Sequence, residues 1–541
     1  MTTPSSGAAI ALSPGHRRVV LLTLCLAAFT INLDTTIVNV TLPTLVRDLN
    51  ASTRQLQWIV DSYNLVFAAF VLAAGSLSDR FGRKGALLTG LAIFAAGSIL
   101  GSRATSPGQL IAIRAVIGLG AAVIFPTTLS ILTNVFTERS ERAKAIGVWG
   151  AMTGVGVAAG PIVGGWLLEH FWWGSVFLAV VPVAAVVAVL TVLWVPTSRD
   201  PNTPRLDLVG LALSTATIGT LVFTIIEAPE VGWLAGRSLA GFAVVAVLLV
   251  VFVRWERRVA EPMLDVDLFR NLRFTAASAS VTISFFALFG FIFMVTQYFQ
   301  FLKGYSPFST GLRLLPVAIS VGAASIIGTK LAVRVGNKAI VSAGLASMGI
   351  AFLWISTASA ATPYLELAGQ MIVLGVGMGF TSAPATEAIM GVVPKEKAGI
   401  GSAINDATRE LGGTLGVAVI GSVFASLYAA RLALPHGLPP EAAHAARESV
   451  GGAFIAAQRV ADAGLGSAAA LLKDAASRAF FDGFAIGCLV AAGVALLGAL
   501  IAAVLLPAHP VDTTGATTQS LEPDADPGEL TPVAPVARPA R

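Results

Sequence analysis

The segment Ile31–Pro43 reads INLDTTIVNVTLP and closes an apolar run that begins at Val19. Asp34 lies inside this run, where an ionised carboxylate costs about 2.5–3.5 kcal/mol on insertion scales. Charged residues within membrane-spanning segments are rare and usually functional. Two questions follow from this carboxylate: whether the chain spans a membrane, and which groups offset the cost of burying Asp34.

The composition indicates an integral membrane protein. Of the 541 residues, 55% are hydrophobic and 12% are charged, and the mean hydropathy is +0.80. A soluble domain carries about 25% charged residues. The two cysteines, Cys25 and Cys488, lie in apolar segments, so no disulfide framework is indicated. The first apolar run is too long for a cleaved signal peptide, so we expect the first helix to be retained.

A helix of about 20 apolar residues crosses a bilayer. Lys and Arg concentrate in alternate loops, a bias that predicts cytoplasmic N- and C-termini and accounts for the basic isoelectric point without nucleic-acid binding. The sequence contains fourteen suitable runs, at residues 19–40, 56–74, 85–101, 109–132, 145–168, 172–195, 208–226, 238–253, 276–299, 310–331, 339–357, 365–393, 401–427 and 480–506.

A repeated loop divides these helices into two halves. The loop after the second helix reads GSLSDRFGRKGALL (Gly75–Leu88), and the loop after the tenth reads TKLAVRVGNK (Thr329–Lys338), with Gly82 aligned to Gly336. This offset predicts two parallel six-helix repeats separated by two inserted helices. The predicted parts are a cytoplasmic tail (1–18), a first bundle (19–195), the inserted helices (206–255), a second bundle (274–507) containing an extracellular loop with surface helices (428–479), and a disordered cytoplasmic tail (508–541).

Three motifs together resemble those of the major facilitator superfamily, and in particular its fourteen-helix drug:proton antiporter family. Leu33–Pro43 looks like the helix 1 signature of that family, Gly75–Lys84 matches the loop 2–3 signature, and Gly156–Gly165 is similar to the helix 5 signature of antiporters. The resemblance covers nearly the whole chain and implies an all-α integral membrane protein with the major facilitator fold. One departure is Ile117, which replaces a usual Gln and puts in doubt a polar contact near Arg114.

Three ionisable residues are expected at a similar depth in the first bundle. Counting 1.5 Å per residue along their helices places Asp34, Asp61 and Arg114 in the outer half of the membrane. Facing one another across a wet cavity, these groups would largely offset one another's burial cost. We interpret Asp34 or Asp61 as the proton carrier, with Arg114 biasing its protonation. The alternative is a static, fully paired structural cluster.

A second group of charges is predicted in the inner half of the second bundle. Asp406 and Glu410 stand one turn apart on one helix face, Arg409 can pair with Asp406, and Glu387 approaches from the preceding helix. Acidic groups in an apolar cavity suit lipophilic cations, which is a hypothesis about the substrate. The alternative is that the thirteenth helix begins later and leaves Asp406 in a cytoplasmic loop.

The loop after the second helix is expected to be cytoplasmic. We expect Asp79 to cap the following helix, and the basic residues to contact lipid headgroups or clamp the opposite half. The resemblance implies a cytoplasmic gate, although a role in topology alone is the alternative. Val333 replaces Asp79 in the second copy, so the two gates should differ. The gate residues are Gly75, Asp79, Arg80, Gly82, Arg83 and Lys84.

The fifth helix carries small residues on one face. Gly156, Gly160 and Gly164 are four residues apart, a spacing that allows another backbone to approach closely, and Gly165 follows. Pro161 removes a backbone donor and can bend the helix. We predict that this helix packs tightly at the seam between the halves and seals the cavity against proton leak. The alternative is that small residues are simply common in membrane helices.

These features predict a proton-coupled exporter of small amphipathic compounds such as drugs, antibiotics and lipophilic cations. The alternative is a proton-coupled importer or exporter of an endogenous metabolite on the same fold. No phosphate-binding GxxxxGK[ST] loop and no catalytic cluster occurs in the sequence. We therefore expect no enzymatic activity, no metal, no cofactor other than protons and no nucleic-acid partner. The protein is expected to be a monomer in the plasma membrane of a bacterium, with the lipid bilayer and a drug-like substrate as partners.

Overall fold

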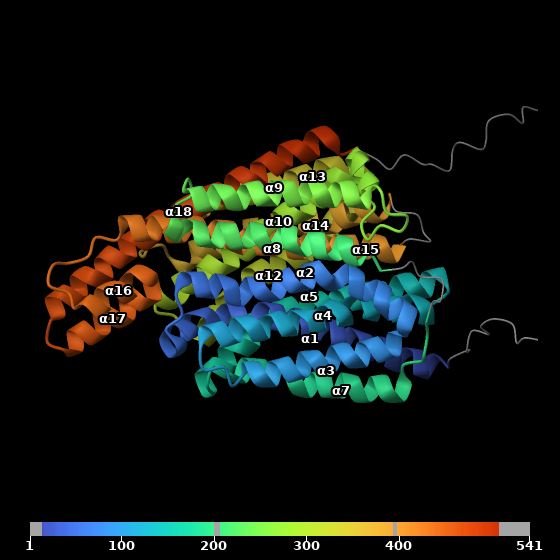
Figure 1. Ribbon diagram of the computed structural model, residues 1–541, viewed down its shortest axis with the longest axis horizontal. Coiled ribbons are helices and arrows are strands. Elements are labelled where there is room, and N and C mark those ends of the chain that lie inside the picture. The colour runs from blue at the N-terminus through green and yellow to red at the C-terminus, as the bar shows by residue number, and fades with distance from the viewer. Residues whose placement is uncertain (1–12, 200–205, 393–397, 508–541) are drawn as a thin grey trace, which may run out of the picture.

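The computed structural model describes residues 13–199, 206–392 and 398–507 (Figure 1). All regular elements within these ranges are helices. Fourteen segments of them are long and apolar enough to cross a membrane. The predicted fourteen-helix, all-α membrane architecture is therefore confirmed. The predicted tail 508–541 and residues 1–12 of the predicted N-terminal tail lie outside the described residues.

The first six spans form the N-terminal half, in which α6 and α7 together make one span. Its helices are α1 (Pro14–Leu49), α2 (Thr53–Phe81), α3 (Arg83–Gly101), α4 (Pro107–Val135), α5 (Arg139–His170), α6 (Ser175–Leu178) and α7 (Val180–Trp194). The inserted helices are α8 (Leu208–Val231) and α9 (Gly236–Glu256), followed by the short helix η1 (Val266–Arg270).

The last six spans form the C-terminal half, in which α10 continues into η2 and α11 continues into α12. Two further helices, α16 and α17, connect the last two spans. The elements are α10 (Leu272–Gln297), η2 (Tyr298–Leu302), α11 (Pro307–Arg313), α12 (Leu315–Val335), α13 (Asn337–Ile355), α14 (Tyr364–Met390), α15 (Ala398–Arg431), α16 (Pro440–Glu448), α17 (Val450–Asp462) and α18 (Gly466–Leu505).

The two halves use the same glycine backbone conformation at equivalent turns. The turn from α2 to α3 passes through Gly82 with φ +120°, and the turn from α12 to α13 passes through Gly336 with φ +89°. Side chains other than glycine rarely adopt such angles, which explains why both copies of the loop carry glycine there. The aligned loops therefore occupy equivalent places, as the internal repeat predicts.

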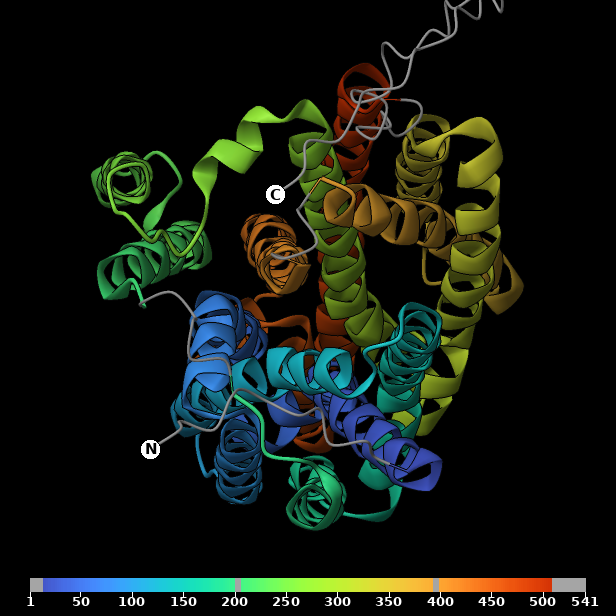
Figure 2. The ribbon, with the colours of Figure 1, turned by 90° about the vertical axis from the view of Figure 1, so that its right-hand side faces the viewer.

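The inserted helices cover one side of the seam between the halves. The helix α8 packs against α2 and α15, and α9 packs on α8. Ile225 and Ile226 of α8 share a buried apolar cluster with Ala418 of α15. Arg54 at the start of α2 forms ion pairs with Glu227 (3.1 Å) and with a second glutamate of α8. In the view along the bundle, α8 and α9 lie to one side of both halves (Figure 2).

Hydrogen bonds between the halves gather at one end of the bundle. Helix α1 begins and helix α18 ends at one end of the bundle, which we call the termini end, and α16 and α17 project from the opposite hairpin end (Figure 1). Near the hairpin end, the Gln57 side-chain amide donates to the backbone oxygens of Val417 (3.2 Å) and Ala418 (3.1 Å). The Gln300 amide donates to the Val40 oxygen (2.8 Å). This conformation is therefore closed at the hairpin end.

Two predicted boundaries differ from the structure. Helix α1 begins at Pro14, inside the predicted tail, because the Ser13 hydroxyl accepts a hydrogen bond from the first turn and Pro14 occupies the first helical position. The predicted loop 428–479 is too long, because α15 continues to Arg431 and α18 already begins at Gly466. The start of α18 is held by alanine-rich packing against α17. The surface helices predicted inside that loop are present as α16 and α17.

The glycines of α5 lie in two helix contacts, one with α1 and one with α11. Gly156, Gly160 and Gly164 face α1, where a Cβ on Gly160 would lie 2.9 Å from the Ile37 nitrogen. Gly165 instead faces α11 of the other half, where a Cβ would lie 2.6 Å from the Cα of Phe308. Contact of α5 with the opposite half, as predicted, therefore occurs at Gly165.

The neighbouring Pro161 shares this contact with the other half. Its carbonyl oxygen abuts Gly311 of α11. Pro161 lies inside the continuous helix α5. The predicted role of these residues as a seal against protons stays a prediction.

Replacing Gly160 by leucine should destabilise the protein, because the side chain would have to push α1 away. Overpacking of this kind costs about 1–3 kcal/mol. We expect Gly160→Leu to lower the melting temperature of the purified protein in detergent. Gly154→Leu is the matched control on the same helix, because nothing lies within 4 Å of a Cβ there. Equal melting temperatures for the two variants would contradict the close α1–α5 packing.

Candidate functional site

Asp34 and Arg114 form a buried ion pair between α1 and α4. The Arg114 Nη1 donates to Asp34 Oδ2 at 2.7 Å, and the two side chains are 1% and 0% exposed. Arg114 Nε also donates to the Ile59 oxygen of α2 at 3.2 Å. The guanidinium carbon lies 4.2 Å from the centre of the Tyr63 ring. The structure therefore brings together the predicted acid and base of the first half.

Glycine contacts set the position of Arg114. Four residues after Arg114, Gly118 faces the backbone of Tyr63, and a Cβ there would lie 3.1 Å from the Tyr63 Cα. The departure from the family pattern, Ile117, is buried against Gly97 of α3. Isoleucine at this position therefore fills a helix contact, and Arg114 finds its polar partners on α1 and α2.

Asp61 lies in the same half but outside the ion pair. It is 0% exposed, and neither of its carboxyl oxygens has a hydrogen-bond partner. One oxygen of Asp34, Oδ1, also lacks a partner. An ionised carboxylate without a partner is very costly to bury, whereas a protonated one costs far less. The environment of Asp61 therefore favours its neutral form, and that of Asp34 supplies an opposite charge.

The second-half cluster lies on α15. Because this helix begins at Ala398, Asp406 lies within it, and the alternative placement of Asp406 in a loop is wrong. Arg409 Nη1 approaches Asp406 Oδ1 to 3.8 Å, and its guanidinium lies 4.6 Å from the Phe285 ring centre. Glu410 has a buried oxygen, Oε2, without a hydrogen-bond partner. Arg409 also acts electrostatically on Glu410, but its ion pair is with Asp406.

Glu387 lies apart from the recorded contacts of this cluster. It lies near the end of α14, and its side chain is exposed. The contact between α14 and the cluster region is made by its neighbour Thr386, whose hydroxyl donates to the Asn405 side-chain oxygen at 3.0 Å. Helical periodicity turns adjacent side chains to different directions, so only one of the two residues can face α15. No ion pair or hydrogen bond of the Glu387 side chain with Asp406 is recorded in this conformation, and the predicted grouping of the two residues stays a prediction.

The predicted capping role of Asp79 is wrong. Asp79 lies in α2, and its carboxylate accepts from Arg83 Nε at 2.7 Å, one turn further along the chain. The cap of α3 is Gly82, which offers no side-chain acceptor. The backbone nitrogen of Arg83 is satisfied instead by the Ser198 oxygen at 3.0 Å. The ion pair thus braces the tight turn between α2 and α3.

The other gate residues also contact their own half. Lys84 Nζ donates to the Val192 oxygen of α7 at 2.8 Å, and Gly75 packs against Pro126 of α4. The Arg80 guanidinium lies over the ring of the phenylalanine that follows it. The described contacts of these residues fit a gate that is not engaged while the hairpin end is closed. Their gating role stays a prediction.

Tyr63 and Thr35 belong to the site, although the sequence analysis did not single them out. Tyr63 is 0% exposed, and its hydroxyl lies 3.2 Å from Thr35 Oγ1. A signal was available, because Tyr63 lies seven residues inside an apolar run, far from the interfacial position that tyrosine favours in membrane helices. Asp61 and Tyr63 lie two positions apart on α2, so they point in different directions around the helix.

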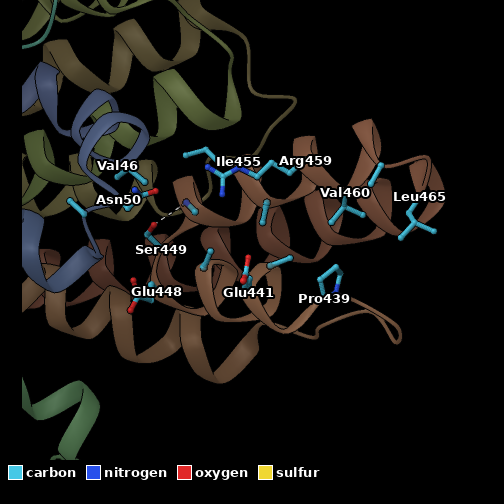
Figure 3. A pocket seen from close by; sticks show the side chains of 16 residues that line it. Val46, Asn50, Pro439, Glu441, Glu448, Ser449, Ile455, Arg459, Val460 and Leu465 are labelled. Carbon is cyan, nitrogen blue, oxygen red and sulfur yellow. Dashed lines mark hydrogen bonds between the residues drawn. The ribbon is translucent and has the colours of Figure 1, made fainter.

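A cavity of about 250 Å³ lies away from these charges, beneath α16 and α17 at the hairpin end (Figure 3). Its walls come from Val46 and Asn50 of the α1–α2 corner and from Ile455 and Arg459 of α17. Among the described residues, no group of three or more His, Cys, Asp or Glu side chains could hold a metal ion. The buried carboxyl groups are thus the chemically distinctive feature of the bundle.

Two repeated six-helix halves with buried charges at their centre define a membrane carrier rather than a soluble protein. The sequence pattern of the Major Facilitator Superfamily matches residues 24–417. The chain is 38% identical over 492 residues to the multidrug efflux pump LfrA of Mycolicibacterium smegmatis. This aligned region covers 91% of this chain and 97% of LfrA. The protein therefore belongs to the major facilitator superfamily, as the motifs predict.

Other relatives carry resistance names. The chain is 37% identical over 411 residues to the multidrug resistance protein Stp of Mycobacterium tuberculosis, covering 76% of each chain. It is 35% identical over 394 residues to the methylenomycin A resistance protein of Streptomyces coelicolor, covering 73% of this chain and 83% of that one. A bacterial homologue of the human lysosomal transporter Spinster, in an inward-facing and occupied conformation, shares the fold with a TM-score of 0.65 and 16% identity over 92% of this chain and 98% of that one.

Removing one partner of the Asp34–Arg114 ion pair should lower the stability of the protein more than removing both partners. Each single variant, Asp34→Leu or Arg114→Met, leaves one buried charge unpaired, a change that costs about 3–5 kcal/mol. The double variant removes both charges. We expect its melting temperature to exceed that of either single variant. Additive losses in this double-mutant cycle, measured on purified protein, would show that the two charges do not depend on each other.

Proposed function

We propose that the protein is a proton-coupled antiporter that exports small amphipathic compounds, lipophilic cations above all, across the plasma membrane by alternating access. The observation that carries this proposal is the buried Asp34–Arg114 pair, with unpartnered carboxyl oxygens nearby in the same half and on Glu410 of the other half. Intramembrane acids with access to both protonation states are the groups that proton-driven carriers use. Export, rather than uptake, is supported by the names of the relatives, which are efflux and resistance proteins.

In this proposal the two carboxyl groups of the first half, Asp34 and Asp61, differ in protonation state. Asp34 is ionised while Arg114 pairs with it, and Asp61 carries a proton. When the helices move and Arg114 withdraws, Asp34 becomes costly to bury as an anion and takes up a proton. Opening to the other side restores the pair and releases the proton. Either carboxyl group can serve as the carrier, which leaves that choice to experiment.

The second half supplies the substrate contact. Arg409 acts electrostatically on Glu410 but makes its ion pair with Asp406 and stacks on a phenylalanine, so Glu410 Oε2 keeps no hydrogen-bond partner. A lipophilic cation would offset the charge of Glu410 and bury its own apolar surface in the same step. We assign Asp406 and Arg409 to the support of Glu410. The rival function, transport of an endogenous metabolite on the same fold, has no specific observation in its favour.

We further propose that the termini end faces the cytoplasm and that the hairpin end faces outward. The excess of Lys and Arg in the loops of the termini end supports this orientation. Closure at the hairpin end then corresponds to a carrier that is open to cytoplasmic drugs. The proposal includes a bacterial plasma membrane, a monomer, and no cofactor, metal, enzymatic step or nucleic-acid partner.

Asp34→Asn should abolish efflux driven by a pH gradient. The amide neither takes up a proton nor pairs with Arg114 as an anion, so the exchange between the paired and the protonated state is lost. The measurement is ethidium transport in everted vesicles with an acidic interior, and vesicles without the protein give the baseline. Membrane content must match that of the unaltered protein, as judged by immunoblot. Full gradient-driven transport by Asp34→Asn would refute its role as proton carrier.

Glu410→Gln should weaken transport of cations more than that of neutral compounds. Loss of one charge-assisted contact costs about 1.5–3 kcal/mol, which corresponds to a rise of about tenfold or more in KM for a monovalent cation. Glu387→Gln is the matched control, because Glu387 is an exposed acid of the same type whose side chain has no recorded ion pair with Arg409. Equal KM values for cations in Glu410→Gln and Glu387→Gln would exclude Glu410 as the cation contact.

A further inference from the structure

Two buried carboxyl groups face each other where the inserted helices begin and end. Asp207 directly precedes α8 and Glu256 is the last residue of α9, and the two residues are 7% and 2% exposed. A Cβ on Gly210 would lie 2.5 Å from Asp207 Oδ2 and 2.4 Å from Glu256 Oε1. The two carboxyl oxygens therefore flank one point, and they are separated by no more than the sum of these two distances.

The two carboxyl groups have different hydrogen-bond partners. Asp207 Oδ1 accepts from the Gly210 nitrogen at 2.8 Å, and both oxygens of Asp207 accept from Trp255 Nε1 at 2.9 Å. Glu256 Oε2 accepts from the Leu264 nitrogen at 3.1 Å, whereas Oε1 is buried without a partner. Donated hydrogen bonds stabilise an anion. Asp207 is therefore the ionised member of the pair, and Glu256 is the member that has to be neutralised.

Basic side chains do not neutralise this pair among the described residues. The charged residue that acts electrostatically on Glu256 is Asp207, which is itself an acid. The neighbouring Arg257 is exposed and approaches Asp267 of η1 to 3.8 Å instead. Two buried carboxyl groups this close cannot both stay ionised without a cation between them. The remaining charged residues at this end of α9 and in the segment up to α10 are Arg254, Arg258, Glu261, Asp265 and Arg270.

A proton is the cation that best fits this geometry. Calcium and magnesium ions take about six or more oxygen ligands, and no group of three or more His, Cys, Asp or Glu side chains among the described residues could hold a metal ion. A proton needs only two acceptors. Carried by Glu256 Oε1, it can be donated to Asp207 Oδ2 after a small rotation of either side chain.

We propose that Asp207 and Glu256 form a proton-binding site outside the two six-helix halves, in which Glu256 carries the proton and Asp207 accepts its hydrogen bond. The proton comes from water at the termini end and returns there when Glu256 ionises. The bound proton holds the start of α8 against the end of α9. Because Glu256 also holds Leu264, which packs against the large apolar core, the site joins the inserted helices to the segment that leads into α10.

Loss of the proton leaves two facing anions, which repel each other and separate the ends of α8 and α9. The site thus makes the contact between the inserted helices and the connecting segment dependent on pH. This inference goes beyond the proposed function and is independent of it, because neither acid belongs to the Asp34–Arg114 pair or to the cluster on α15.

Fluorine NMR of the full chain labelled with 5-fluorotryptophan tests this site, because Trp255 donates to Asp207 and reports on its surroundings. The Trp255 resonance is assigned by its absence in Trp255→Phe and is followed in detergent from about pH 5 to about pH 9. We expect one titration in the unaltered protein. Glu256→Gln has the shape of the protonated acid, so its Trp255 resonance should stay at the low-pH position throughout.

Asp267→Asn is the matched control, because Asp267 is an acid of the same segment whose side chain is 59% exposed, and it should leave the titration unchanged. Asp207→Asn is the second variant, which keeps the test valid if Glu256→Gln misfolds. It removes the neighbouring charge and should move the midpoint of the titration.

The proposal is overturned if the titration persists in Glu256→Gln, keeps its midpoint in Asp207→Asn, or disappears equally in Asp267→Asn. A Trp255 resonance that ignores pH but moves when sodium or potassium chloride is added would also overturn it, because the cation would then be a metal ion. These outcomes leave the proposed function untouched, since efflux by the Asp34 variant tests that function separately.

Discussion

The ion pair between Asp34 and Arg114 is the constraint on which the organisation of the first half depends. Each charge alone would be very costly in a low-dielectric interior, so α1 and α4 must hold the two side chains together. The same arginine reaches the backbone of α2 and rests on Tyr63. Three helices therefore share one charged group, and any sliding of one helix changes the environment of Asp34. The proposed proton coupling requires this sensitivity, which a purely apolar core would lack.

The two halves are alike in packing and unlike in charge. Gly156 and Gly160 bring α5 onto α1, and Gly412 and Gly416 bring α15 onto α10 in the same manner. The repeat thus preserves the close backbone contacts within each half. The charges do not follow the repeat: α1 holds an acid that has a basic partner on another helix, whereas α15 holds Glu410 without one. Two halves with the same helix packing can therefore place different chemical groups at the centre of the protein.

The sequence predicted the parts of this arrangement that leave a local signal. Long apolar runs, the repeated loop with Gly82 and the buried charge of Asp34 each have a direct physical cost or benefit, and each was located correctly. The orientation of a side chain around its helix has no such signal at a helix end, so the sequence did not show that Thr386, rather than Glu387, contacts Asn405. Tyr63 was missed because its importance comes only from neighbours on other helices. Helix ends were misjudged where tertiary packing extends a helix, as at the start of α18.

The two halves are joined by hydrogen bonds, which water can replace when the seam opens. Each ion pair recorded for the described residues lies within one half, within a loop or at the inserted helices, and none of those recorded joins the two six-helix halves. The seam at the hairpin end is instead held by amides such as Gln57 and Gln300, which donate to backbone oxygens. A neutral hydrogen bond contributes about 0.5–1.5 kcal/mol net, and water can replace it when the seam opens. Ion pairs thus tie helices together within each half, whereas the halves are joined by single hydrogen bonds, including those from Arg47 to Gln300 and from Phe308 to Glu169, which can break one at a time.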